Sequence, residues 1–257
     1  MNIDLHLPTE LLKPFIKAYR IIESQDCLVN RVLPDTSVAI AFRYKGQVNY
    51  MSSDNVRELP VSAISCLRKS VRLIRYSENT ATIIVLFKEA GATFFLKEPI
   101  HELFEETVSL DNFVRRQKIL GIEEHLVEAD NNHKRIAIIE KFLLSLLHNQ
   151  KADELIFTAL QRIRLSKGSL KIKDLADSLY ISQDAFEKRF RKMVGTSPKQ
   201  FSSIIRMKSI VNQSPQKQTL SQITFEAGYF DQPHFNKDFK ICTGLTPSEF
   251  FKSPSFW

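Results

Sequence analysis

The side chains with the clearest chemistry lie near the C-terminus, in the segment YFDQPHFNKDFKICTGLTPSEFF (residues 229–251). Its lysines can donate hydrogen bonds to guanine O6 and N7, and its histidine can donate to a base or a phosphate. Asparagine and glutamine side chains can pair with adenine. Any amphipathic helix has a polar outer face, so this segment indicates base recognition only if the pattern recurs in the chain.

The pattern does recur. Residues 172–201 (IKDLADSLYISQDAFEKRFRKMVGTSPKQF) align with residues 220–250 (LSQITFEAGYFDQPHFNKDFKICTGLTPSEF). The first apolar positions correspond at an offset of 48: Ile172, Leu175 and Leu179 match Leu220, Ile223 and Ala227. One extra residue in the second turn makes the offset 49 for six identical positions: Phe186/Phe235, Lys188/Lys237, Phe190/Phe239, Gly195/Gly244, Pro198/Pro247 and Phe201/Phe250. The opening segment is therefore the second copy of a repeated unit.

Each copy has the signals of two short helices joined by a tight turn. Ser182 and Asp231 are placed to cap the N-terminus of the second helix. Gly195 and Gly244 stand where a C-capping residue of positive φ is expected. The paired phenylalanines, four residues apart, form the buried face. This arrangement predicts two helix-turn-helix units, whose second helices can enter a DNA major groove.

The outer faces of these second helices carry the candidate DNA contacts. In the first copy they are Gln183, Asp184, Glu187, Lys188 and Arg191. In the second copy they are Gln232, Pro233, His234, Asn236, Lys237 and Lys240. The two acids of the first helix repel phosphate unless they accept from cytosine N4. Glu187 has a second option, because it can pair with Arg191 one turn later.

The elements that position these helices divide the chain into two predicted domains. Residues 1–90 contain β-branched and aromatic runs separated by short turn signals, which indicates a small barrel or sandwich. From about Glu98 the apolar spacing becomes helical. The polar segment HNQKAD (148–153) is a plausible boundary. The predicted fold class is an N-terminal α+β domain (strands, then helices) followed by an all-α domain.

The charge distribution agrees with this division. The whole chain carries a net +7. Residues 1–155 hold 20 Lys and Arg against 21 Asp and Glu, a net of −1, whereas residues 156–257 hold 16 against 8, a net of +8. A basic block of this kind suits a polyanionic partner, either nucleic acid or an acidic membrane face. A solvated lysine-rich surface would have the same charge.

Composition excludes several classes of protein. Apolar content of 43% with 25% charged residues is typical of soluble globular domains. The longest apolar runs, such as TATIIVLF, are far shorter than the roughly 20 residues that span a bilayer. No secretion signal is evident at the N-terminus. Cys27, Cys66 and Cys242 are too few and too far apart for a disulfide framework or a zinc site. We therefore expect a cytoplasmic protein without a metal or other cofactor.

Residues 154–257 resemble the DNA-binding domain of AraC/XylS-type transcription regulators. The motif GYFDQPHFNKDFKICTGLTPSEFF is similar to the C-terminal signature of that family, and GSLKIKDLADSLYISQDAFEKRFRKMVGTSPKQF to its first helix-turn-helix. The resemblance implies helix-turn-helix units at 171–194 and 220–242, joined by a connecting helix at 198–212. The two second helices would then enter successive major grooves on one face of the DNA.

The resemblance also implies roles for individual residues. The base-contacting residues would be Asp184, Glu187 and Lys188 in the first unit, and Pro233, His234 and Lys237 in the second. The phosphate-contacting residues would be Arg191, Lys192, Lys199, Arg206 and Lys240. Phosphate contacts position a protein on DNA without specifying the sequence. Double-stranded DNA is thus the expected partner, and RNA polymerase is a further candidate.

For residues 1–150 the resemblance implies a sensor or dimerisation domain, with the effector unidentified. His6, His101, His125 and His133 lack metal-ligand spacing. Arg43, Arg72 and Arg75 could line an anion pocket or point outward from a half-buried sheet. The stripe of Ile136, Ile139, Leu143, Leu146 and Leu147 is either core or a contact with a second copy through residues 134–148.

Two other functions compete with sequence-specific regulation. A non-specific architectural DNA-binding protein would be basic too, but it needs no repeated reading helices. An alkyl-transfer repair enzyme would need a reactive cysteine. Cys27 and Cys66 lie in strand-like runs, where a buried and inert thiol is the usual state. No neighbouring His or Glu marks either one as activated, so we predict no enzymatic activity.

Overall fold

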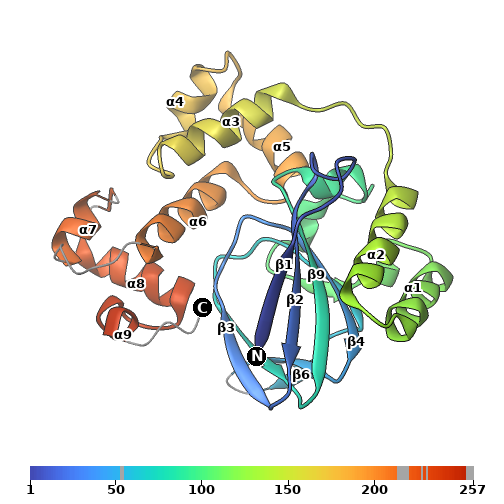
Figure 1. The fold of residues 1–257 in the computed structure, drawn as a ribbon. Helices are drawn as coiled ribbons and strands as arrows, with labels where there is room; N and C mark the ends of the chain where they lie inside the picture. The colour runs from blue at the N-terminus through green and yellow to red at the C-terminus, as the bar shows by residue number, and fades with distance from the viewer. Residues whose placement is uncertain (53–54, 213–219, 227, 230, 253–257) are drawn as a thin grey trace. The chain divides into compact units, whose positions relative to one another are not determined.

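The computed structural model describes residues 1–52, 55–212, 220–226, 228–229 and 231–252 (Figure 1). The chain forms two compact units. The N-terminal unit comprises residues 1–30, 37–66 and 73–151. The C-terminal unit comprises the chain from residue 152 onward together with two short segments, 31–36 and 67–72.

Two β-sheets build the N-terminal unit. The larger sheet has the strand order β1-β2-β9-β4-β7-β10, and its neighbouring strands pair antiparallel. The smaller sheet has the order β3-β8-β5-β6. In chain order the strands are β1 (Asn2–His6), β2 (Ile16–Ser24), β3 (Leu28–Val32), β4 (Ala39–Lys45), β5 (Val48–Met51), β6 (Val56–Glu58), β7 (Ser62–Ser65), β8 (Arg72–Tyr76), β9 (Thr80–Phe87) and β10 (Thr107–Ser109).

The central strands of the larger sheet bury one face against two helices. On that face lie six β-branched or aromatic side chains with at most 1% exposure: Tyr19, Ile21, Ile40, Phe42, Ile83 and Val85. The helices are α1 (Arg116–Glu128) and α2 (Asn132–Leu146). The rings of Phe42 and Phe142 meet edge to face at 5.9 Å, and the buried Glu140 accepts from the Tyr19 hydroxyl at 3.1 Å. The core of this unit therefore lies between the sheet and α2.

The sequence-based prediction of β-structure before residue 90 is confirmed, with differences in detail. The segment 63–77 contains two strands, because residues 66–71 separate β7 from β8. Four aromatic residues of this unit, Phe42, Phe87, Phe94 and Phe95, are all buried.

The expected helix from about Glu98 begins much later. Two short 3-10 turns (Ile100–Leu103 and Leu110–Asn112) flank β10, and regular helix starts only at Arg116. Strand β10 exists because Thr107–Ser109 pair with Ala63–Ser65 of β7, a contact between distant parts of the chain. Such pairing overrides a local helical pattern.

The apolar stripe of α2 is mainly core. Ile139 and Leu143 are fully buried, and Ile136 and Leu146 are half-buried. Leu147 follows the helix and is 37% exposed. Of the two interpretations of this stripe, packing within the unit is the one that the structure supports, which leaves little of it for a second copy.

The C-terminal unit is helical after residue 152. Asp153 caps α3 by accepting from the backbone N–H of Ile156 at 3.2 Å. The helices are α3 (Glu154–Leu165), α4 (Ile172–Asp177), α5 (Gln183–Val194), α6 (Pro198–Val211), α7 (Leu220–Glu226), α8 (Gln232–Thr243) and α9 (Pro247–Lys252). The predicted fold class, an α+β domain followed by an all-α domain, is confirmed. Across the residues that the structure describes, no helix is long and apolar enough to span a membrane.

Candidate nucleic-acid interface

The first helix-turn-helix unit consists of α4 and α5. Ser182 accepts a hydrogen bond from the N–H of Ala185, so it caps α5 as predicted. Gly195 ends α5 with φ 84°, a conformation that costs glycine little. Phe186 and Phe190 are fully buried and their rings lie 5.7 Å apart. The buried face of α5 is therefore the predicted one, and the opposite face is left for a partner.

The second unit consists of α7 and α8 and repeats these features. Asp231 accepts from the N–H of His234 at 2.7 Å, and Pro233 lies in the first turn of α8. Gly244 ends the helix with φ 77°. Phe235 and Phe239 are fully buried, with ring centroids 5.6 Å apart. The two second helices thus share caps, buried face and termination.

The turns of the two units also correspond. Tyr180 has φ 55° and Gly228 has φ 74°, and these two residues lie at the predicted offset of 48 in the repeat. A positive φ at both positions reverses the chain between the two helices of each unit. Of the apolar positions aligned earlier, Leu175 and Ile223 are buried. Ala227 lies outside the described residues.

Helix α6 holds both units. It starts at a capping box in which Ser197 and Gln200 satisfy each other's backbone N–H groups. Phe201 near its start packs edge to face on Phe190 of the first unit at 5.6 Å. Met207 and Ile210 near its end belong to the hydrophobic cluster that contains Phe235 and Phe239. One helix thus packs into the cores of both units.

On the outer face of α5, the carboxylate of Glu187 already contacts two neighbouring side chains. Asp184 and Lys188 are exposed. Glu187 is half-buried: its Oε1 accepts from Gln183 Nε2 at 2.9 Å, and its Oε2 lies 3.4 Å from Arg191 Nη2. The suggested pairing of Glu187 with Arg191 is confirmed. Of the three predicted base-contacting residues of this helix, Asp184 and Lys188 are therefore the two that are exposed.

On α8 the predicted base-contacting residues Pro233, His234 and Lys237 are all exposed. The imidazole Nε2 of His234 lies 3.6 Å from the carboxylate of Asp238. Asn236, expected on the outer face, is half-buried, and its Oδ1 is buried without a hydrogen-bond donor in the described structure. Asp238 was not predicted as part of this surface. Its position four residues after His234 would have indicated that the two side chains are neighbours on the helix.

Four of the five predicted phosphate-contacting residues are exposed: Arg191, Lys192, Lys199 and Lys240. Arg206 on α6 differs from them. Its Nη2 donates to the carbonyl oxygen of Gly168 at 2.7 Å, and its guanidinium lies 5.5 Å from the ring centre of Tyr229. These contacts give Arg206 a structural role between α6 and the residues around it.

Two family models match the chain. Residues 175–253 match a model described as a helix-turn-helix domain, and residues 4–109 match a domain of unknown function, DUF6597. The first match runs from α4 to the end of α9 and includes both second helices, α5 and α8. The C-terminal unit therefore contains a helix-turn-helix domain, as the AraC-type resemblance implied.

Two curated relatives are named as regulators. The Msm operon regulatory protein of Streptococcus mutans is 28% identical over 156 residues, covering 59% of this chain and 55% of that protein. An uncharacterized HTH-type transcriptional regulator of Haemophilus influenzae is 30% identical over 121 residues, covering 46% of this chain and 39% of that protein. The chain spans about half or less of the length of these relatives.

Two solved structures are similar to the chain at low sequence identity. ToxT from Vibrio cholerae has a TM-score of 0.44 and 12% identity, covering 91% of this chain and 96% of that one. The C-terminal domain of AraT from Geobacillus stearothermophilus has a TM-score of 0.38 and 20% identity, covering 41% and 89%.

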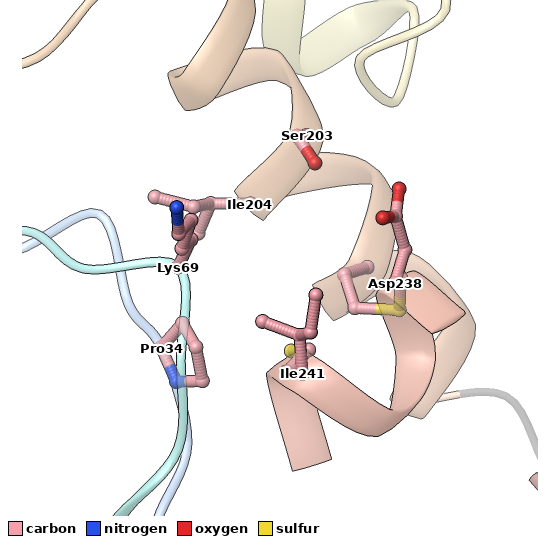
Figure 2. Close-up of a pocket in the computed structure, with 8 residues that line it drawn as sticks. Pro34, Lys69, Ser203, Ile204, Asp238 and Ile241 are labelled. Carbon is pink, nitrogen blue, oxygen red and sulfur yellow. The ribbon is translucent and has the colours of Figure 1, made fainter. Parts of the chain in front are cut away.

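A small pocket lies beside α6 and α8 of the C-terminal unit (Figure 2). Pro34 and Lys69, from the two short segments of this unit, face residues of both helices across it. Its lining is completed by Ser203, Ile204, Met207, Asp238, Ile241 and Cys242. The pocket holds about 80 Å³. Ligand sites usually hold roughly 300–1,000 Å³, so we do not assign an effector to it.

The two short segments are tied to the same helices by hydrogen bonds. The N–H of Val71 donates to the carbonyl of Ile241 at 3.1 Å. Lys208 of α6 pairs with Asp35 at 2.5 Å. Asp35 also accepts from the N–H of Thr36 at 2.6 Å. These contacts fix the C-terminal end of α8 relative to α6.

The cysteines differ from expectation at one position. Cys66 is buried as predicted, but Cys27 is exposed and precedes β3, where Arg75 Nε approaches its sulfur to 3.4 Å. The prediction of a buried Cys27 is therefore wrong, because the strand starts one residue later. Burial raises the pKa of the Cys242 thiol to about 12.

In the part of the chain that the structure describes, no group of three His, Cys, Asp or Glu residues is arranged to hold a metal ion.

Proposed function

We propose that this protein regulates transcription by reading two successive major grooves of double-stranded DNA with α5 and α8. The observation that carries the proposal is the repeated unit: two capped helices with the same buried phenylalanine face, both packed on α6. A helix exposed on one side and held rigidly on the other is the geometry that groove recognition requires. The net charge of +8 after residue 155 supports a polyanionic partner.

In this proposal the second helix is the stronger base reader. Lys237 is exposed and can donate to guanine O6 and N7, while His234 and Pro233 flank it at the start of α8. On the first helix Lys188 has the same role, and Asp184 can accept from cytosine N4. Glu187 contributes less, since its carboxylate is already engaged by Gln183 and Arg191. Arg191, Lys192, Lys199 and Lys240 contact phosphates.

A pair of matched substitutions tests this assignment. Lys237→Ala should reduce discrimination at one base pair by about 1–3 kcal/mol, whereas Lys199→Ala should weaken binding to every duplex about equally. Lys199→Ala should also lower the slope of log affinity against log salt by about 1. Fluorescence anisotropy with a specific and a random duplex measures both effects. Equal losses on both duplexes for both variants would contradict base reading by Lys237 and favour an architectural role.

We further propose that the N-terminal unit binds a small anionic effector between its sheets. Arg43 and Thr82 are paired neighbours on β4 and β9, on the sheet face opposite Phe42. Arg43 Nη1 and Thr82 Oγ1 are buried and have no hydrogen-bond partner among the described residues. Arg43 Nη2 reaches Glu58 on the second sheet at 2.9 Å. A carboxylate or phosphate would satisfy both buried groups.

Thermal-shift screening of the full chain with small carboxylates and phosphates tests the effector. A stabilising compound should lose its effect in Arg43→Gln. Glu58→Gln is the control, because Glu58 is half-exposed and its loss breaks the ion pair while leaving Arg43 in place. An equal shift in the wild type and Arg43→Gln would contradict the site without affecting the DNA-binding proposal.

A further inference from the structure

The first strand of the N-terminal unit is an edge strand. Among the described strands, β1 pairs with β2 alone and ends the six-stranded sheet. Half of its backbone N–H and C=O groups therefore point away from the sheet, where another strand can pair with them. Proteins usually protect such an edge with charged residues, proline or a covering element.

Asp4 is the one acid in β1, and apolar side chains make up much of the rest of this edge. Ile3, Leu5 and Leu7 alternate along the strand and its continuation, and they are 43%, 66% and 78% exposed. Ile3 and Leu5 lie opposite Ile22 and Arg20 of β2, so they share one face of the sheet. We call these three residues the β1 apolar row. An exposed apolar row beside an open backbone edge is typical of a surface that another chain covers.

We propose that β1 pairs antiparallel with β1 of a second copy of this chain. The register places Leu5 opposite Leu5 of the second copy, on the two-fold axis. Ile3 then lies opposite Leu7 of the second copy, and Asp4 opposite its His6. The interface joins the two six-stranded sheets at their edges.

The side chains select this register over its neighbours. Moving the pairing by two positions, so that Ile3 faces Leu5 of the second copy, places Asp4 opposite Asp4, and like charges directly opposite destabilise a sheet. Moving it by one position sets the apolar row against Asp4 and His6. Only the proposed register pairs the apolar row with itself and an acid with a histidine.

The complementarity of β1 to itself also indicates that the partner of this edge is a second copy of the chain. A two-fold interface needs a surface that is complementary to itself, and β1 meets that condition in both its apolar row and its charges. The apolar stripe of α2 offers no comparable surface, because Ile139 and Leu143 are fully buried. Edge pairing of so short a strand is smaller than the roughly 1,600 Å² of a standard stable interface. The dimer should therefore form in the micromolar range.

Sedimentation velocity of the full chain between about 1 and about 100 µM tests the dimer. The wild type should pass from monomer to dimer over this range. Leu5→Asp places two carboxylates opposite each other on the axis and should remain monomeric, with a dissociation constant raised at least about 100-fold. Val127→Asp on α1 is the matched control, since Val127 is 63% exposed, and it should dimerise like the wild type.

Cysteine crosslinking tests the register, in a Cys27→Ser background because Cys27 is exposed. Directly opposed strand residues have Cα atoms about 4.5–5.5 Å apart, within disulfide range. Leu5→Cys should crosslink to itself, whereas Ile3→Cys should crosslink only when mixed with Leu7→Cys. A wild type that stays monomeric at the highest concentration would overturn the proposal. So would equal effects of Leu5→Asp and Val127→Asp, or self-crosslinking by Ile3→Cys without any by Leu5→Cys.

Discussion

The hydroxyl of Tyr229 donates a hydrogen bond to the carboxylate of Asp238 at 3.3 Å. The same carboxylate oxygen lies 3.6 Å from Nε2 of His234, at the exposed start of α8. Tyr229 is 8% exposed, so it anchors Asp238 from the interior of the unit. The carboxylate of Asp238 therefore lies beside the ring of His234 at the exposed start of α8.

This relationship predicts that Asp238 positions His234 for base reading. Asp238→Asn should lower discrimination at one base pair by up to about tenfold, near 1.4 kcal/mol, because the ring loses the negatively charged neighbour that orients it. Affinity for random DNA should stay equal or rise, since a negative charge has been removed. Competition anisotropy with single-base-pair variants of a specific duplex measures this, with Tyr229→Phe giving a smaller effect in the same direction. An equal loss on all duplexes would show that Asp238 matters only for folding.

A second prediction concerns the acid on α5. Glu187→Gln keeps the hydrogen-bonding shape beside Gln183 but removes a charge that repels phosphate and holds Arg191. Affinity for random duplex DNA should rise about two- to tenfold near physiological salt, with a steeper salt dependence. Glu124→Gln on α1 is the charge-matched control and should leave binding unchanged. Unchanged affinity in Glu187→Gln would mean that this face of α5 lies away from the phosphates.

The sequence-based predictions were accurate where a feature depends on residues close together in the chain, and they failed where it depends on residues far apart in the chain. The caps at Ser182 and Asp231, and the phenylalanines spaced by four, are set by residues within one or two helical turns, and all were predicted. Strand β10 depends on β7 more than 40 residues earlier, so its local helical spacing misled. Arg206 likewise looked like a free cation on a helix, because nothing near it in sequence shows that Gly168 lies within hydrogen-bonding distance.

Gly168 provides a test of how α6 is held. It has φ 76°, and a Cβ atom there would stand 2.2 Å from the carbonyl oxygen of Ser202 on α6. Gly168→Ala should therefore destabilise the C-terminal unit by about 2–4 kcal/mol, through strain and the displaced backbone. Urea unfolding followed by circular dichroism measures the loss. Gly121→Ala on α1 is the control: no atom lies within 4 Å of its added Cβ, so stability should rise by about 0.5–1 kcal/mol.

Alkaline pH should weaken the N-terminal unit. Burial raises the pKa of Tyr76 from 10.0 to about 12, although the nearby Arg20 lowers it. Between these values the unfolded chain loses a proton that the folded chain keeps. Stability is therefore full below pH 10.0 and falls as the pH rises to about 12, by up to about 3 kcal/mol. Urea midpoints across this range should drop less steeply in Tyr76→Phe; equal slopes in both proteins would contradict the assignment.

Selection of the full-length protein against a random duplex pool at near-physiological salt tests the central claim most directly. Two helices held by α6 for successive major grooves should enrich two motifs about 10 base pairs apart. The motif assigned to α8 should lose one preferred base pair in Lys237→Ala. Salt-sensitive binding without any enriched sequence would contradict the claim that α5 and α8 read bases.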